Sequence, residues 1–287
     1  MKGRKLLMIP GPVEFTPEVM RAMGMPTASH VAPNFIEAFG LALERLREVF
    51  LCPSGQPFVV AGSGSLAMDM AAANLVEPGD KALVINTGYF GDRFAAILGR
   101  YGAEVTEARA ATIGDAPDLA DVEAALEADQ FKVMTITHVD TSTAVGADVQ
   151  ALAALGRQYG VLVVVDGVCS VAGEEMRQEE WGIDLALTAS QKAIGVPPGL
   201  ALIVAGLRAM GMPTASHVAP NFIEACGLAL ERLREVFLCS SGQPFVVAGS
   251  GSLAMDMAAA NLVERGDKAL VVNTGYFGDR FAAILGR

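Results

Sequence analysis

The sequence predicts an α/β fold in which a largely parallel sheet is layered with helices. Short apolar runs bounded by turn residues recur along residues 1–206, and amphipathic segments with helical spacing lie between several of them. Hydrophobic residues make up 52% of the 287 residues and charged residues 18%, so the chain can bury a sizeable core.

The apolar runs are typical of buried strands and the amphipathic segments of helices. The predicted strands are residues 57–61, 82–86, 133–137, 161–165, 185–188 and 200–205. The predicted helices are residues 35–51, 65–76, 93–101, 119–127 and 149–159. Because ligands bind at the carboxyl ends of the strands in such sheets, we expect the functional residues directly after them.

Charge and composition exclude several classes of partner. The net charge is −11, from 21 basic and 32 acidic residues, which argues against nucleic acid or an anionic membrane as a partner. No apolar run approaches the roughly 18–20 residues of a membrane span. No metal site is expected, because three scattered histidines do not form one. The cysteines have neither zinc-site nor disulfide spacing, and we expect free thiols in a reducing cytoplasm at Cys52, Cys169, Cys226 and Cys239.

An internal duplication dominates the organisation of the chain. Residues 21–100 recur at 208–287, and this pattern has too few copies for a repeat architecture. We interpret it as a recombination or a fusion, with residues 1–206 forming one domain and residues 207–287 the near-identical copy. The two copies differ at four of 80 positions, namely Phe39/Cys226, Pro53/Ser240, Pro78/Arg265 and Ile85/Val272.

The two copies should compete for one position against residues 101–206. If Phe39 is buried on the apolar stripe of its helix, Cys226 would leave a void in that position. Pro78 suits the second position of the turn 77–80, and its loss costs about 0.4–1 kcal/mol. Both differences favour the first copy, so we expect the second copy to pack poorly or to exchange with another chain.

A small-residue turn follows the first predicted strand and opens a helix. It contains Ser63, Gly64 and Ser65. Small residues let backbone N–H groups approach an anion, and the helix N-terminus favours negative charge, so the turn is a candidate phosphate site. An ordinary serine-capped helix start is the alternative interpretation.

Two charged residues follow later strands. Asp166 ends an apolar run, where a carboxylate needs a cationic partner or hydrogen bonds, although capping a turn would also explain it. Lys192 follows the strand at 185–188 and precedes the rigid segment 195–199. A single lysine is usually a solvated surface residue, but desolvation at this place would favour a neutral, nucleophilic amine.

The segment 183–192 followed by 199–201 resembles the lysine attachment signature of class V pyridoxal-phosphate-dependent aminotransferases, most closely the alanine–glyoxylate and serine–pyruvate branch. Other matching motifs occur in the expected order at residues 10–12, 62–65, 88–93, 138–143 and 165–166. The resemblance covers residues 1 to about 206. It implies fold type I, a mostly parallel sheet with helices on both faces, with the usual C-terminal small domain replaced by the duplicated segment.

The resemblance also implies residue roles. Lys192 would form the Schiff base with pyridoxal 5′-phosphate and carry the proton between substrate Cα and cofactor C4′. Asp166 would pair with the pyridinium nitrogen and keep the ring an electron sink. The remaining implied cofactor contacts are to the phosphate from Ser63, Gly64 and Ser65, to the ring face from Phe90, to the ring hydroxyl from Thr141, and to the phosphate or ring from Gln191.

The function implied is transamination of small amino acids and 2-oxo acids, alanine or serine with glyoxylate or pyruvate, by a homodimer that could be segment-swapped. The alternative is a cofactor-binding but catalytically impaired remnant or recombinant fusion. It would lack the arginine that binds the substrate carboxylate, because family members carry that arginine in the small domain. A lyase or desulfurase is less favoured, since no mobile catalytic cysteine loop is evident.

Overall fold

A computed structural model describes residues 7, 9, 11–26, 32–211, 220–244, 251–264 and 266–286 of the chain. It divides the chain into two compact units, Met1–Met212 and Pro213–Arg287. The two units are described in turn.

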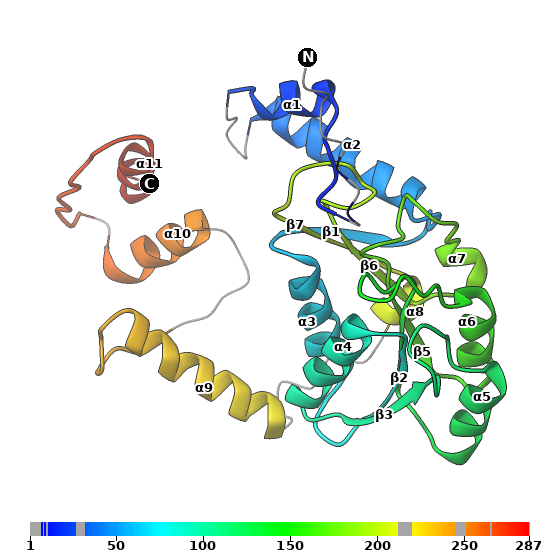
Figure 1. The fold of residues 1–287 in the computed structure, drawn as a ribbon. Coiled ribbons are helices and arrows are strands. Elements are labelled where there is room, and N and C mark those ends of the chain that lie inside the picture. Colours follow the sequence, from blue (N-terminus) through cyan, green and yellow to red (C-terminus); the bar gives the residue numbers. More distant parts are fainter. Residues whose placement is uncertain are drawn as a thin grey trace. The chain divides into compact units, whose positions relative to one another are not determined.

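The first unit contains a seven-stranded sheet in the order β1-β7-β6-β5-β4-β2-β3 (Figure 1). Strand β7 is antiparallel to both of its neighbours, and the other adjacent pairs are parallel. All strands except β7 therefore run in one direction and end at the same edge of the sheet. The strands are β1 (Gln56–Ala61), β2 (Lys81–Asn86), β3 (Glu104–Arg109), β4 (Val133–Thr137), β5 (Leu162–Asp166), β6 (Leu185–Ala189) and β7 (Leu200–Ala205).

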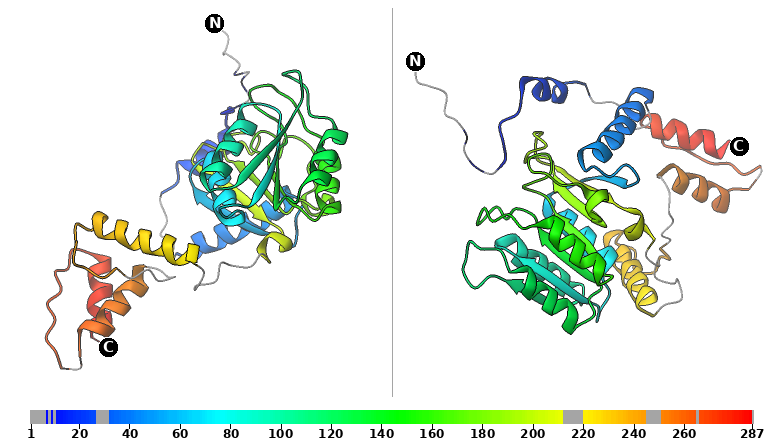
Figure 2. Two further views of the ribbon diagram at one scale, coloured as in Figure 1. Left: turned by 90° about the horizontal axis from the view of Figure 1, so that it is seen from below. Right: turned by 90° about the vertical axis from the view of Figure 1, so that its right-hand side faces the viewer.

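Helices cover both faces of this sheet. Their bounds are α1 (Pro17–Met23), α2 (Pro33–Val49), α3 (Gly64–Leu75), α4 (Tyr89–Arg100), α5 (Leu119–Ala128), α6 (Val149–Gln158), α7 (Gln178–Trp181) and α8 (Leu207–Met210). Figures 1 and 2 show α3 and α4 on one face and α5 and α6 on the other.

Two apolar clusters fill the layers between the sheet and these helices. In β2, Ala82 and Val84 pack in the cluster with α3 and α4, whereas Leu83 and Ile85 pack in the cluster with α5 and α6. Successive side chains of a strand point to opposite faces, so a strand buried on both faces must be apolar throughout. This explains why β2, β4, β5 and β6 read as continuous apolar runs.

The sequence-based prediction of the sheet is largely confirmed. Strands β4 and β7 have the predicted bounds, and β1, β2, β5 and β6 differ by one residue at one or both ends. The mostly parallel arrangement with helices on both faces is also confirmed. Helix α4 begins four residues earlier than predicted.

The sequence does not predict α1, α7, α8 or β3. In strand β3 only Val105 and Ala108 are half-buried, and the four exposed residues include Glu104, Glu107 and Arg109. It lies at an edge of the sheet, pairing with β2 alone. An edge strand needs no continuous apolar run, so the pattern that identifies the central strands is missing here.

The condition that Phe39 is buried is not met, although Phe50 at the end of the same predicted stripe is fully buried and Leu46 packs against the core. Within α2, all of which the structure describes, no residue is buried. Phe39 is 39% exposed and stacks on Phe35 with 5.8 Å between ring centroids. The argument that a cysteine at the Phe39 position leaves a void therefore does not apply within this chain.

The second unit contains α9 (Pro220–Val236), α10 (Gly251–Leu262) and α11 (Tyr276–Leu285). These are the sequence equivalents of α2, α3 and most of α4. Residues 266–274, the equivalent of the β2 region, form no strand. Large apolar side chains of this unit are exposed, with Leu262 at 80% and Leu270 at 92%. In the first unit, the equivalent residues Leu75 and Leu83 are 5% and 0% exposed.

Within the residues that the structure describes, no helix has the length and apolar character needed to cross a membrane. No group of three or more His, Cys, Asp or Glu side chains in the same part of the chain is arranged to hold a metal ion.

Candidate functional site

The carboxyl edge of the sheet brings the predicted site residues together. Ser63, Gly64 and Ser65 follow β1, Phe90 follows β2, and Thr141 follows β4. At the centre of the same edge, Asp166 is the last residue of β5, and Gln191 and Lys192 follow β6. Contacts between these strand-end segments define how the site is built.

Asp166 is a buried carboxylate, 3% exposed. Burial raises the pKa of this carboxyl group to about 6, and the hydrogen bond that its Oδ1 accepts from the Val168 N–H at 3.0 Å acts in the opposite direction. The Asp140 carboxylate also raises the pKa of Asp166, and the Lys192 ammonium lowers it. Asp166 and Lys192 are therefore close enough to interact electrostatically. The hydrogen bond from Val168 and the charge of Lys192 together stabilise the carboxylate less than burial destabilises it.

Lys192 is 8% exposed although it lies in a loop between β6 and β7. Ser190, which is fully buried, closes this loop, because its hydroxyl donates to the Pro197 carbonyl at 2.7 Å and accepts from the Leu200 N–H at 3.2 Å. A turn starts at Lys192 itself, whose carbonyl accepts from the Gly195 N–H at 2.9 Å. The segment that carries the amine is thus fixed at both ends.

The small-residue turn caps α3. The Ser63 hydroxyl accepts from the Leu66 N–H at 3.4 Å, in the position of a helix N-cap. Gly64 is buried, and a Cβ on it would lie 2.7 Å from Cγ2 of Val168, in the turn that follows Asp166. Ser65 is half-buried in the first turn of the helix. The N-terminus of α3, with its free N–H groups, is therefore packed against the Asp166 turn.

Asp140 joins the segments that follow β2 and β4. This carboxylate is fully buried and accepts from the Phe90 N–H at 2.8 Å and from the Ser142 hydroxyl at 2.6 Å. It thus stabilises the N-terminus of α4, where Phe90 is half-buried. The Thr141 hydroxyl lies 2.8 Å from the Cys169 sulfur, which ties the β4 segment to the turn after Asp166.

Asp140 and Ser190 are structural members of the site that sequence reasoning missed. A signal for Asp140 was present, because it is an acidic residue just beyond a buried strand, as Asp166 is. Nothing in the pattern around Ser190 distinguishes it from a surface serine. At Gln191 the structure shows a main-chain contact, with its carbonyl accepting from the Val13 N–H at 3.1 Å.

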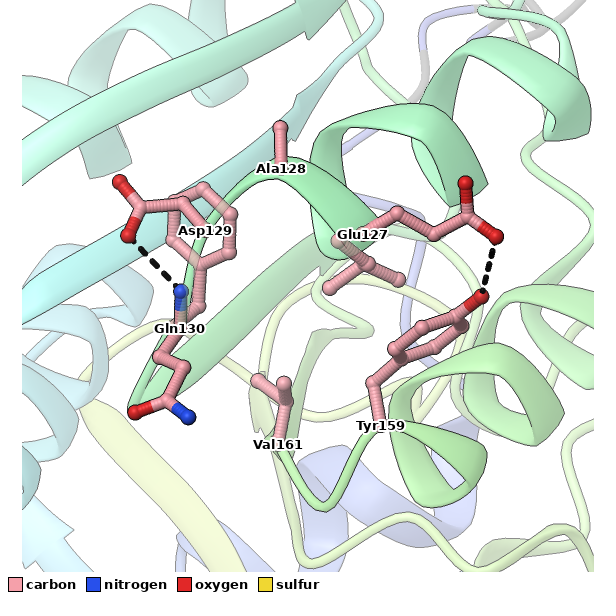
Figure 3. A pocket seen from close by; sticks show the side chains of 8 residues that line it. Glu127, Ala128, Asp129, Gln130, Tyr159 and Val161 are labelled. Carbon is pink, nitrogen blue, oxygen red and sulfur yellow. Dashed lines mark hydrogen bonds between the residues drawn. The ribbon is translucent and has the colours of Figure 1, made fainter.

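A separate hollow lies at the opposite edge of the sheet, where β4 and β5 begin (Figure 3). Glu127, Asp129, Gln130 and Tyr159 line it, with the Tyr159 hydroxyl donating to Glu127 at 3.2 Å. The Asp129 carboxylate is paired with Lys81 at 2.6 Å. None of the predicted site residues lines this hollow. Its acidic character also disfavours a phosphate.

Comparison with known proteins gives a consistent answer. The sequence model of the family Aminotransferase class-V matches residues 18–211. Alanine–glyoxylate aminotransferase 1 of Saccharomyces cerevisiae is 42% identical over 217 residues, which cover 73% of this chain and 56% of the yeast protein. Ureidoglycine–glyoxylate aminotransferase of Bacillus subtilis superimposes with a TM-score of 0.71 at 28% identity, over 82% of this chain and 62% of that one. Alanine–glyoxylate aminotransferase of Nostoc sp. gives 0.70 at 31% identity, over 80% and 62%.

The chain belongs to the class-V aminotransferase family. The predicted fold type I is confirmed by the same likeness. The chain spans about half the length of the curated relatives that it matches.

The family implies pyridoxal phosphate as cofactor, and the described residues fit it. An aldehyde needs an amine, which Lys192 offers, and a ring nitrogen that must stay protonated needs a buried acid such as Asp166. A phosphate is bound well by free N–H groups at a helix N-terminus, and α3 offers such groups. Its first residue is Gly64, at a position where Val168 leaves no room for a side chain.

Proposed function

We propose that this chain binds pyridoxal phosphate through Lys192 and transaminates small amino acids and 2-oxo acids, alanine or serine with glyoxylate or pyruvate. One observation carries the proposal. A buried lysine and a buried aspartate interact electrostatically at the carboxyl edge of the sheet, where the N-terminus of α3 packs against the aspartate's turn. The yeast relative, named as an alanine–glyoxylate aminotransferase, supports the substrate class.

The residues divide the chemistry between them. The bound cofactor supplies an aldehyde that condenses with an amine, releasing water, and a ring that withdraws electrons from the substrate Cα. The Lys192 amine would hold the cofactor and would move a proton between the substrate Cα and the cofactor carbon C4′. The Asp166 carboxylate would keep the ring nitrogen protonated, and its burial would strengthen that ion pair because the local dielectric is low.

The remaining residues hold the cofactor in place. Ser63, Gly64 and Ser65 receive the phosphate at the start of α3, where backbone N–H groups are free. The Phe90 ring would cover one face of the cofactor ring. The Thr141 hydroxyl would contact the ring hydroxyl, and the Gln191 side chain would contact the phosphate or the ring.

Cofactor binding is tested by absorbance. After incubation with pyridoxal phosphate and removal of unbound cofactor by gel filtration, the chain should stay yellow, and Lys192→Ala should abolish this retained colour while Lys132→Ala leaves it. Lys132 is a matched control because it pairs with Asp80 far from the candidate site. A colourless wild-type protein, or a yellow Lys192→Ala variant, would contradict the proposal.

A second candidate function is a cofactor-binding but catalytically impaired remnant or recombinant fusion that lacks the substrate-carboxylate arginine. It is supported by the second unit, which repeats residues 21–100 and leaves Leu262 and Leu270 exposed where their equivalents Leu75 and Leu83 are buried. A single-turnover experiment separates the two, since a transaminase releases pyruvate from alanine in an amount equal to the bound cofactor. The remnant would be favoured if the protein is coloured but forms neither pyruvate from alanine nor hydroxypyruvate from serine.

We also propose that the chain forms a homodimer in which the second copy can exchange between subunits. The proposal is supported by large apolar side chains that are exposed and could pack against another subunit. They are Phe35, Ile36 and Phe39 on α2, and Leu262 and Leu270 in the second unit. Light scattering gives the oligomeric state, and a compact monomer at all concentrations would contradict the dimer.

Disulfide trapping tests the exchange. In the sheet, Val84 of β2 faces Thr135 of β4, and Val271 is the sequence equivalent of Val84. In a cysteine-free background, Val271→Cys with Thr135→Cys should give a disulfide-linked dimer if the second copy enters a neighbour's sheet. Val84→Cys with Thr135→Cys is the control that should link within one chain. Trapping in the control pair alone would reject the exchange.

A cytoplasmic location is the last part of the proposal. It is supported by the free thiols of Cys52, Cys169 and Cys239. Recovery of the protein in a secreted fraction would contradict it.

A further inference from the structure

The N-terminal segment 11–13 lies directly against the lysine loop. The Val13 N–H donates to the Gln191 carbonyl at 3.1 Å. A Cβ built on Gly11 would lie 3.1 Å from Cε and 3.3 Å from Nζ of Lys192, and closer still to its Cδ. Gly11 therefore lies directly beside the terminal half of the Lys192 side chain, from Cδ to Nζ.

This contact explains why a loop lysine is only 8% exposed. The hydrogen bonds of Ser190 fix the main chain of the loop and do not themselves cover the Lys192 amine. Residues 11–13, here called the N-terminal wall, provide that cover. The wall comes from a part of the chain about 180 residues before the lysine.

Gly11 is required in the wall for two separate reasons. Its φ of +146° lies in a region that side chains with a Cβ rarely adopt. In addition, any Cβ would occupy the space of the Lys192 stem. The second reason links the residue to the amine and not only to the backbone.

We propose that Gly11 is a positioning residue for Lys192. The N-terminal wall holds the end of the lysine side chain against the loop, excludes water from the amine, and so fixes the direction from which the amine meets an aldehyde. This inference rests on the proposed function for its catalytic meaning, although the shielding of Lys192 can be measured without cofactor.

Three variants separate positioning from backbone strain. Gly11→Ala adds a methyl group that meets a flexible side chain, so Lys192 can move aside while the fold persists. Gly114→Ala introduces similar strain at φ +103°, where no atom lies within 4 Å of the added carbon. Val13→Pro removes the N–H that ties the wall to Gln191 and adds nothing next to the lysine.

The first measurement uses the full-length, cofactor-free protein. Each protein is treated briefly with acetic anhydride, and mass spectrometry gives the acetylation of Lys192 relative to Lys132. Gly11→Ala and Val13→Pro should raise the relative labelling of Lys192 several-fold, whereas Gly114→Ala should match the wild type. Fluorescence of Trp181, the sole tryptophan, reports whether each variant is folded.

The second measurement is the rate at which the absorbance band of added pyridoxal phosphate shifts to that of its imine with the protein. It should fall several-fold in Gly11→Ala and stay unchanged in Gly114→Ala. Wild-type labelling and wild-type rate in Gly11→Ala would overturn the inference, as would equal effects in Gly114→Ala. If Gly11→Ala does not fold, unchanged labelling in Val13→Pro rejects it. If the wild type itself stays colourless, the proposed function fails, and the labelling alone still decides whether the wall shields Lys192.

Discussion

Replacing Asp166 by asparagine should stabilise the cofactor-free protein at neutral pH while weakening its hold on the cofactor. Among the residues that the structure describes, no cation forms an ion pair with this buried carboxylate, and burial raises its pKa to about 6. In the cofactor-free protein an ionised Asp166 is therefore destabilising, and a bound cationic ring would compensate its charge. Asparagine has the same shape, and its oxygen can still accept from the Val168 N–H.

The magnitude follows from linkage. The pKa rises from 3.8 to about 6, or about 2 units, and each unit corresponds to 1.36 kcal/mol, so the group contributes roughly 3 kcal/mol. Because the folded state binds this proton more tightly than the unfolded state, the contribution is fully present below about pH 3.8 and is lost as the pH rises through about 6. Between about pH 5 and pH 7.5 the wild type should lose about 1.4 kcal/mol from this group alone, and Asp166→Asn should lose none of it.

Urea unfolding of the cofactor-free proteins measures this difference. Trp181 is the sole tryptophan and lies in the first unit, so its fluorescence follows the domain that contains the site. Burial also raises the pKa of Asp184 and lowers that of His138, but both groups titrate in both proteins and cancel in the comparison. A stability difference between wild type and variant that stays constant from about pH 5 to pH 7.5 would refute the reasoning. Equilibrium dialysis should show weaker cofactor binding by the variant.

Three further substitutions test how the site is supported. Arg208→Ala should lower the free energy of unfolding by about 1–3 kcal/mol, because it leaves the buried Asp184 carboxylate unpaired. The control is Arg21→Ala at the equivalent position of the first copy, which breaks an exposed ion pair and should cost less than about 0.5 kcal/mol. Urea unfolding compares the two variants. Asp140→Asn should cost about 1–3 kcal/mol in the same assay, since the new amide cannot accept all the hydrogen bonds that the carboxylate receives, and an unchanged midpoint would contradict this. Gly64→Ala should reduce cofactor affinity in dialysis, because the added methyl lies 2.7 Å from Val168 and displaces the start of α3; wild-type affinity would argue against a phosphate there.

Much of the sheet could be predicted because its central strands are buried on both faces. The continuous apolar runs in β4 and β5 follow from that burial, and the position of Asp166 follows from where β5 ends. Strand β3 has one neighbour and half-exposed faces, so its sequence carries no such run. The pattern of apolar residues along a segment indicates which residues are buried, but it does not indicate that an exposed segment pairs at the edge of a sheet.

The predicted site residues could be located but their supports could not. Strand ends place Lys192 and Asp166 at one edge from topology alone. Gly11 is different, because its contact with Lys192 depends on where an irregular N-terminal segment crosses the loop. No spacing in the sequence encodes a contact between segments that far apart.

The duplication shows which elements this sequence forms by itself and which elements need partner strands from elsewhere in the chain. Helices α10 and α11 form in the second copy over the equivalents of α3 and α4, since a helix satisfies its backbone within its own segment. The equivalent of β2 forms no strand, and Val272 there is 82% exposed where Ile85 is 0% exposed. The partners of β2 are β3 and β4, which occur once in the chain and already pair with the first copy.

The same comparison bears on the candidate site. Helix α10 begins at Gly251, the equivalent of Gly64, so the second copy also has a helix N-terminus at this motif. It has no equivalent of Asp166 or Lys192, because those residues lie outside the duplicated segment. A small-residue turn before a helix is therefore insufficient by itself. The proposed site lies at the edge where β1, β5 and β6 end together, and in this structure the first copy contributes its turn to that edge.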